Sequence, residues 1–154
     1  MTCKGSGLEY RRATSSDLPA CLHVRGQTRD NPLTPDYLAS LGVTTESWGP
    51  LVDSGQSVGF VAEKKTQLAG FCFADTRSGE VTVLALLPEF EGLGAGRSLL
   101  HLTTQILFSS GREEVWLKAS PDPQTRAYGF YRHLGWRWSG ATDEIGDQVL
   151  LLRA

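Results

Sequence analysis

Alternating hydrophobic and polar residues predict most of the strands of this chain. The alternation places one face of each strand in a core and the other in water. Such segments cover residues 8–14, 56–63, 67–74, 114–118, 136–139 and 148–153. Residues 80–87 are nearly all apolar, so we expect that strand to be buried on both faces and central in its sheet.

Hydrophobic residues at three- and four-residue spacing predict helices between these strands. The helical segments are residues 15–26, 34–42, 44–52, 97–109 and 124–134. In the fourth, the stripe that should face the core is Leu99, Leu100, Thr103, Ile106 and Leu107. Residues 28–55 carry too much apolar material for a linker, and we expect them to form a helical cap over a site.

The order of these segments predicts one mixed α/β domain over residues 1–154, with residues 1–7 as a flexible tail. Short turns join the strands at 56–63, 67–74 and 80–87, which favours an antiparallel meander. Residues 80–118 then run strand, loop, helix, strand. This order allows the two strands to pair in parallel through a right-handed crossover.

Charge and cysteine content exclude several classes of protein. The 154 residues carry a formal net charge of −2 with scattered basic residues, which argues against nucleic acid or an anionic membrane as a partner. The three cysteines and three histidines stand apart from one another, so neither a disulfide framework nor a metal site is predicted. There is no signal-peptide character and no apolar run that could span a bilayer. We therefore expect a soluble cytoplasmic protein.

Glycines at 92, 94 and 96 follow the apolar strand and precede a helix. Such a loop lets backbone N–H groups approach an anion, and the helix N-terminus adds partial positive charge. An NTPase loop would need a lysine before its serine, but Arg97 precedes Ser98. A dinucleotide fingerprint would need a third glycine at the position of Arg97 or of Leu99. The remaining alternatives are another kind of phosphate cradle or a tight strand-to-helix turn.

Two motifs of the chain resemble the GCN5-related N-acetyltransferases. Residues 84–100 are similar to the segment of that family in which a strand ends in proline, a Gln/Arg-x-x-Gly-x-Gly/Ala loop follows, and a helix opens with Arg and Leu-Leu. Residues 124–136 are similar to its Asn-x-x-Ala-x-x-Phe-Tyr-x-x-x-Gly-Phe motif. The resemblance implies a mostly antiparallel sheet of six or seven strands flanked by helices, in which the fourth and fifth strands are parallel and splay apart.

By this resemblance the co-substrate is acetyl-CoA. The loop and helix N-terminus would hold its pyrophosphate, and the strand edge would pair with its pantetheine arm, with the Leu86 N–H polarising the thioester carbonyl. The implied binding residues are Leu84, Ala85, Leu86, Gly92, Leu93, Gly94, Ala95, Gly96, Arg97 and Gln124. Tyr131 falls on the family's general-acid tyrosine. Its alternative is a packing role beside Phe130 and Trp136, and Tyr128 is interpreted as packing.

Two departures from the family pattern stand out. Glu91 occupies the position of the usual Gln or Arg, and we expect it to point away so that only backbone N–H groups face the anion. Gln124 replaces the usual Asn and keeps the amide on a longer stem. The general base stays open among Glu80, Glu46, Asp30 and His23, and Lys118 lies near the position where some members carry a glutamate.

The resemblance implies acetyl transfer to a primary amine of a small molecule or peptide by direct attack in a ternary complex. Acceptor recognition is expected in residues 26–55, which include Tyr37 and Trp48. The alternative function is a catalytically weak acyl-CoA-sensing or protein-interaction domain. A homodimer is kept open.

Overall fold

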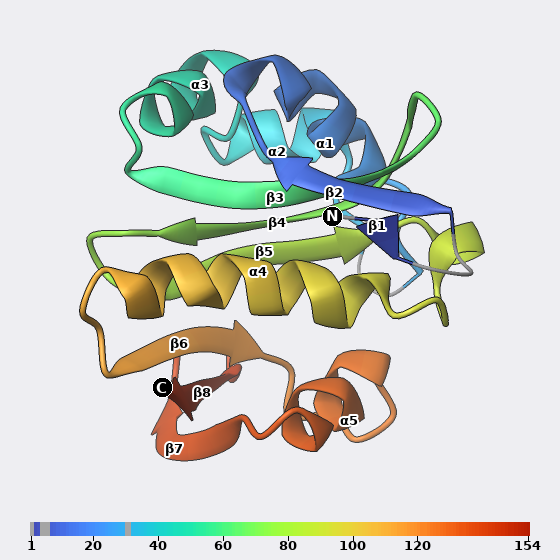
Figure 1. Cartoon of the computed structure of the whole chain (residues 1–154). Helices are drawn as coiled ribbons and strands as arrows, with labels where there is room; N and C mark the ends of the chain where they lie inside the picture. The colour runs from blue at the N-terminus through green and yellow to red at the C-terminus, as the bar shows by residue number, and fades with distance from the viewer. Residues whose placement is uncertain (1, 4–6, 30–31) are drawn as a thin grey trace.

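The computed structural model of the chain describes residues 2–3, 7–29 and 32–154. In these residues eight strands form one sheet in the order β1-β2-β3-β4-β5-β6-β8-β7 (Figure 1). The strands are β1 (Thr2–Cys3), β2 (Leu8–Arg12), β3 (Ser57–Lys64), β4 (Gln67–Asp75), β5 (Glu80–Leu86), β6 (Glu114–Ala119), β7 (Arg137–Thr142) and β8 (Gln148–Arg153). The helices are α1 (Leu18–Arg25), α2 (Pro35–Ser40), α3 (Thr45–Asp53), α4 (Ala95–Ser109) and α5 (Arg126–His133), with 3-10 turns η1 (Ser15–Asp17) and η2 (Pro88–Phe90).

The strand pairing confirms the predicted sheet. β3, β4 and β5 form an antiparallel meander, while β5 and β6 are parallel and connected through α4. All other neighbours in the described sheet pair antiparallel. The mixed, mostly antiparallel fold with one parallel pair therefore has the predicted architecture.

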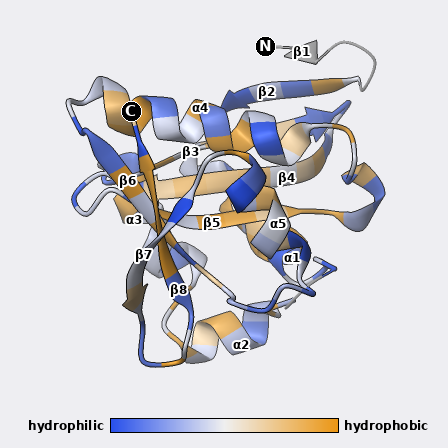
Figure 2. Ribbon diagram, turned by 90° about the horizontal axis from the view of Figure 1, so that it is seen from below, coloured by the Kyte–Doolittle hydropathy of each residue, from blue (hydrophilic) through white to orange (hydrophobic). Residues whose placement is uncertain are grey.

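Helices cover both faces of the sheet. Helix α4 lies on one face, and α1, α2 and α3 lie on the other (Figures 1 and 2). Residues 68–74 of β4 are consecutively buried because this strand is covered on both sides. Hydrophobic colour follows β4 and β5 through the centre of the molecule in Figure 2. The core is thus split into two layers that meet at the sheet.

Three local details differ from the sequence predictions. Thr2–Cys3 pair with β2 as a short strand, where a tail was expected, and residues 1 and 4–6 lie outside the described part of the chain. On α4 the buried stripe includes Thr104, whereas Ile106 is only half-buried. β5 is central as predicted, yet Val83, Leu84 and Leu86 are half-buried. These β5 residues line a cleft, which explains their exposure.

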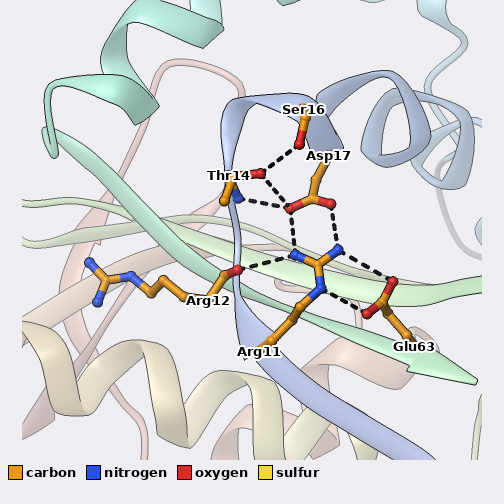
Figure 3. A network of polar contacts seen from close by, with 6 residues as sticks. All are labelled: Arg11, Arg12, Thr14, Ser16, Asp17 and Glu63. Carbon is orange, nitrogen blue, oxygen red and sulfur yellow. Dashed lines mark hydrogen bonds and ion pairs between the residues drawn. The ribbon is translucent and has the colours of Figure 1, made fainter.

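A network around Arg11 fixes the start of α1 against the sheet (Figure 3). The Arg11 guanidinium donates to both carboxylate oxygens of Asp17 at 2.9 and 2.7 Å, and its Nε donates to Glu63 of β3 at 2.8 Å. Asp17 also accepts the Thr14 N–H at 2.8 Å. Burial acts to raise the pKa of Asp17, but these hydrogen bonds outweigh burial and lower it.

Candidate active site

A cleft of about 1570 Å³ opens where β5 and β6 diverge. Within residues 32–154, these two strands pair at one position, where Glu80 at the start of β5 lies opposite Trp116 of β6. Beyond that pair, residues 81–86 of β5 and 117–119 of β6 line the cleft from its two sides. The volume exceeds that of a typical small-ligand pocket, so there is room for a long ligand and a second molecule.

The edge of β5 presents backbone N–H groups to this cleft. The Leu87 N–H donates to the Ala69 carbonyl of β4 at 2.9 Å. Successive N–H groups of a strand point to opposite edges, so the N–H groups of Leu86 and Leu84 face the β6 side. Leu84, Ala85 and Leu86 all line the cleft, which places the predicted strand edge along its wall.

The glycine loop forms the end of the cleft beside α4. Gly92 and Gly94 have φ values of 79° and 80°, in the left-handed region that favours glycine, and a Cβ at either position would meet nothing within 4 Å. Helix α4 begins at Ala95, and the Ser98 N–H makes the hydrogen bond to the Gly94 carbonyl at 3.0 Å. This is the first hydrogen bond of the helix, so the N–H groups of residues 95–97 have no acceptor within the helix and are available to an anion.

Five of the ten predicted binding residues lie together at this end. Gly92, Gly94, Ala95, Gly96 and Arg97 line the cleft. Two other predicted residues, Leu93 and Gln124, lie outside the lining: Leu93 is 39% exposed and Gln124 is also at the surface. Thr125 and Arg126, which follow Gln124, line the cleft in its place.

Glu91 differs from the expectation that it points away from the cradle. Its side chain is only 14% exposed and it lines the cleft. The two carboxylate oxygens accept hydrogen bonds from Nε of Arg29, at 3.0 and 3.3 Å, and the carboxylate also forms an ion pair with Nη1 of Arg126. These partners lie 62 and 35 residues away along the chain, and no local sequence signal connects them to Glu91.

Tyr131 lies on α5 and lines the same cleft. Its ring packs edge-on against Phe130, with centroids 5.2 Å apart, and against Trp136 at 6.1 Å. Burial, with a smaller contribution from the Cys72 thiol, raises the pKa of the Tyr131 phenol. The phenol therefore carries its proton at neutral pH.

The opposite end of the cleft lies under the helical cap. The Trp48 ring packs against Phe73 with centroids 4.7 Å apart, and its Nε1 donates to the Ser57 hydroxyl at 3.1 Å. Trp48 lines the cleft, whereas Tyr37 is 51% exposed and lies outside the lining. Asp75, Lys118 and Asp147 also line the cleft, from β4, β6 and the loop before β8. Neither Asp75 nor Asp147 belongs to a motif, so no local pattern predicts their place in the cleft.

The candidate general bases occupy different environments. Glu46 is fully exposed, and hydrogen bonds at the start of α3 lower its pKa. His23 is exposed, and Asp30 lies outside the described residues. Glu80 is half-buried where β5 and β6 begin to part, and it lies outside the cleft lining beside its register partner Asp75. Burial raises the pKa of Glu80, Asp75 adds to this and Lys118 opposes it. Glu80 is therefore better suited than Glu46 to accept a proton.

Two further observations concern the part of the chain that the structure describes. No group of three or more His, Cys, Asp or Glu side chains in it is arranged to hold a metal ion. None of its helices is both long enough and apolar enough to cross a membrane.

Comparisons with known proteins bear on this site. The family model described as "Acetyltransferase (GNAT) family" matches residues 24–136. An uncharacterized N-acetyltransferase of Chlorobaculum tepidum is 32% identical over 81 residues, which are 51% of this chain and 48% of that protein. The chain therefore matches about half the length of this curated relative.

Solved structures share the fold at low identity. The PaiA N-acetyltransferase of Thermoplasma acidophilum, in complex with coenzyme A, superposes with a TM-score of 0.79 at 19% identity, covering 96% of this chain and 99% of that one. YncA of Salmonella typhimurium, solved with acetyl-CoA, superposes with a TM-score of 0.70 at 15% identity, covering 95% and 93%.

Proposed function

The chain belongs to the GNAT acetyltransferase family, and we propose that it transfers the acetyl group of acetyl-CoA to a primary amine. The amine belongs to a small molecule or a peptide and attacks directly while both substrates are bound. The proposal assigns the glycine-loop end of the cleft to the nucleotide of acetyl-CoA. It assigns the end beneath the cap to the acceptor.

The divergence of β5 and β6 is the observation that carries this proposal. It opens a backbone edge at residues 84–86 that leads directly to the free N–H groups at the start of α4. The pantetheine arm contains amide groups that can pair with such an edge, and a pyrophosphate suits a helix N-terminus. These two features fit the two ends of one extended ligand.

The proposed chemistry uses few groups of the protein. The amine nitrogen attacks the thioester carbonyl carbon, and the Leu86 N–H stabilises the negative charge that develops on the carbonyl oxygen. The C–S bond then breaks, and the leaving sulfur takes a proton from the Tyr131 hydroxyl. The Tyr131 phenol carries its proton when the thiolate leaves, and burial, which raises its pKa, also makes it a weaker acid than an exposed tyrosine.

The acceptor amine must be neutral to attack, so the cleft needs a route for its proton. Glu80 is the proposed acceptor of that proton through water, because it is the register partner of Asp75, which lines the cleft, and because its carboxyl is half-buried with a raised pKa. Trp48 and the neighbouring Leu51 give the acceptor end an apolar wall, while Asp75 and Asp147 can attract a cationic amine. The cytoplasmic location, the homodimer and the single domain stay predictions.

Release of CoA thiol from acetyl-CoA, measured across a panel of amines and peptide N-termini, tests the proposed function. We expect thiol release that depends on one class of amine and on the amount of enzyme. Binding of acetyl-CoA without turnover of any amine would instead favour an acyl-CoA sensor. That alternative has one supporting observation, since β6 carries Lys118 in the cleft. Failure to bind acetyl-CoA would refute both.

A further inference from the structure

A cluster of one glutamate and two arginines borders the glycine loop. Glu91 directly precedes Gly92, and its carboxylate pairs with Arg29 from the segment between α1 and α2 and with Arg126 from the first turn of α5. All three side chains line the cleft together with the loop. The cluster therefore joins three separate segments at the place where the proposed pyrophosphate would bind.

The exposure of the three side chains is uneven. The Glu91 side chain is 14% exposed, whereas Arg29 and Arg126 are 57% and 58% exposed. The carboxylate thus lies beneath two guanidinium groups that reach the solvent-filled cleft. A guanidinium has five N–H donors, and Arg29 uses its Nε toward Glu91. Within the described residues, no acceptor bonds the Nη groups of Arg29, so these donors can serve a ligand.

The charges of the cluster suit an anion. One carboxylate and two guanidinium groups sum to one positive charge, and a single arginine at position 91 would supply the same charge. The two-arginine arrangement adds a second planar fork, and such forks bind phosphate oxygens in a bidentate manner. A buried carboxylate that holds both forks reduces the side-chain freedom that they would lose on binding an anion.

We propose that Arg29 and Arg126 bind the pyrophosphate of acetyl-CoA and that Glu91 is the residue that positions them. The inference rests on the proposed function, because it needs acetyl-CoA as the ligand. It also accounts for the carboxylate in a phosphate cradle: Glu91 faces the arginines, and the arginines face the phosphate. Arg29 and Arg126 are binding residues in this assignment, and Glu91 acts through them.

Calorimetric titration of the full chain with CoA and with 3′-dephospho-CoA tests the assignment. Arg29→Ala and Arg126→Ala should each raise the Kd of both ligands about tenfold, the loss expected for one charge-assisted hydrogen bond. The dependence of Kd on salt should also become shallower. Arg137→Ala, which removes an exposed arginine of β7 outside the cleft lining, is the matched control and should leave Kd unchanged.

The positioning role of Glu91 is tested by a double-mutant cycle. Arg29→Ala should raise Kd about tenfold in the wild-type background but less than threefold in the Glu91→Gln background, because the fork is no longer held there. An equal loss in both backgrounds would overturn the positioning role. A loss seen with CoA but absent with 3′-dephospho-CoA would move the contact to the 3′-phosphate and overturn the pyrophosphate assignment.

The failure of this inference can be separated from the failure of the proposed function. Wild-type protein that binds neither CoA nor acetyl-CoA would refute the proposed function. Wild-type protein that binds CoA normally, with unchanged Kd in Arg29→Ala and Arg126→Ala, would overturn the inference alone. Thermal melting of each variant shows whether a changed Kd comes from partial unfolding, and Arg29→Lys, which keeps the charge and loses the fork, should recover only part of the affinity.

Discussion

Tyr131→Phe removes one hydroxyl from the cleft and leaves the aromatic packing in place. The ring keeps its contacts with Phe130 at 5.2 Å and Trp136 at 6.1 Å. Within the described part of the chain, the Tyr131 hydroxyl has no hydrogen-bond partner, so its removal leaves no described group unsatisfied. We therefore expect the free energy of unfolding to change by less than about 1 kcal/mol.

The expected effect on turnover is much larger. A positioned general acid contributes roughly 10²- to 10⁴-fold, which corresponds to about 2.7–5.4 kcal/mol of activation free energy. Because Tyr131 is proposed to protonate the leaving sulfur and not to hold the nucleotide, the Kd of acetyl-CoA should stay within about twofold. The prediction is therefore a loss of kcat with nearly unchanged co-substrate binding.

The pH dependence adds a second readout. The raised pKa of Tyr131 keeps the donating form populated to a higher pH than for an ordinary tyrosine, near 10. The wild-type rate should therefore show no alkaline loss from this group below about pH 10.

The assay follows thiol release under saturating substrates, together with the Kd of acetyl-CoA by titration. Tyr128→Phe is the matched control, since it removes a hydroxyl one turn earlier on α5, from a ring that the Arg132 guanidinium covers at 3.6 Å. Equal kcat in wild type and Tyr131→Phe would refute the acid role. An equal loss in both variants would attribute the effect to α5 packing.

Three further predictions concern the cradle, the cap and the fold. Gly94→Glu should weaken acetyl-CoA binding at least about tenfold, because it adds left-handed backbone strain and a negative charge at the loop; Gly146→Glu, at φ 92° on the β7–β8 hairpin, should not change the Kd. Trp48→Phe should raise the acceptor KM and leave the acetyl-CoA Kd constant, and the reverse pattern in steady-state kinetics would reject the cap assignment. The lowered pKa of Asp17 means that its stabilising contribution is present above its unfolded pKa, near 3.9, and is lost as pH falls through the folded pKa. In urea unfolding, Asp17→Asn should lower the free energy of unfolding by about 1–2 kcal/mol at pH 6, and this free energy should then fall less steeply as the pH is lowered. An unchanged dependence of the free energy of unfolding on acidic pH would contradict this role of the Arg11–Asp17 pair.

Structural features that depend on neighbouring residues in the sequence could be predicted, and features that depend on contacts between distant segments could not. The strands and helices came from hydrophobic periodicity and capping residues, which act within a few positions of the chain. Thr44 illustrates this, since it begins the predicted helix 44–52 and its side chain caps α3, which continues through Pro50. The glycine loop could also be predicted from the local sequence, because Gly92 and Gly94 adopt positive φ angles that other residues rarely reach.

The candidate site depended on contacts between distant segments. Tyr37 and Trp48 were equivalent in the sequence analysis, but Trp48 turns toward Phe73 and the cleft while Tyr37 stays exposed. Helix α3 packs on β3, whereas α2 packs on α1, and this arrangement decides the difference. Asp75 reaches the cleft from β4 and Asp147 reaches it from the loop before β8, and no motif predicts that these two segments are neighbours.

The sequence by itself determined the elements, their order, the central apolar strand and the glycine loop, because each of these depends on short-range pattern and backbone conformation. The tertiary structure alone decided how far β5 and β6 pair, since that depends on long-range packing of α4 and the final strands. It also decided the partners of Glu91. A carboxylate next to the proposed phosphate cradle is unfavourable in isolation, and it becomes compatible with that cradle when the fold brings two distant arginines to it.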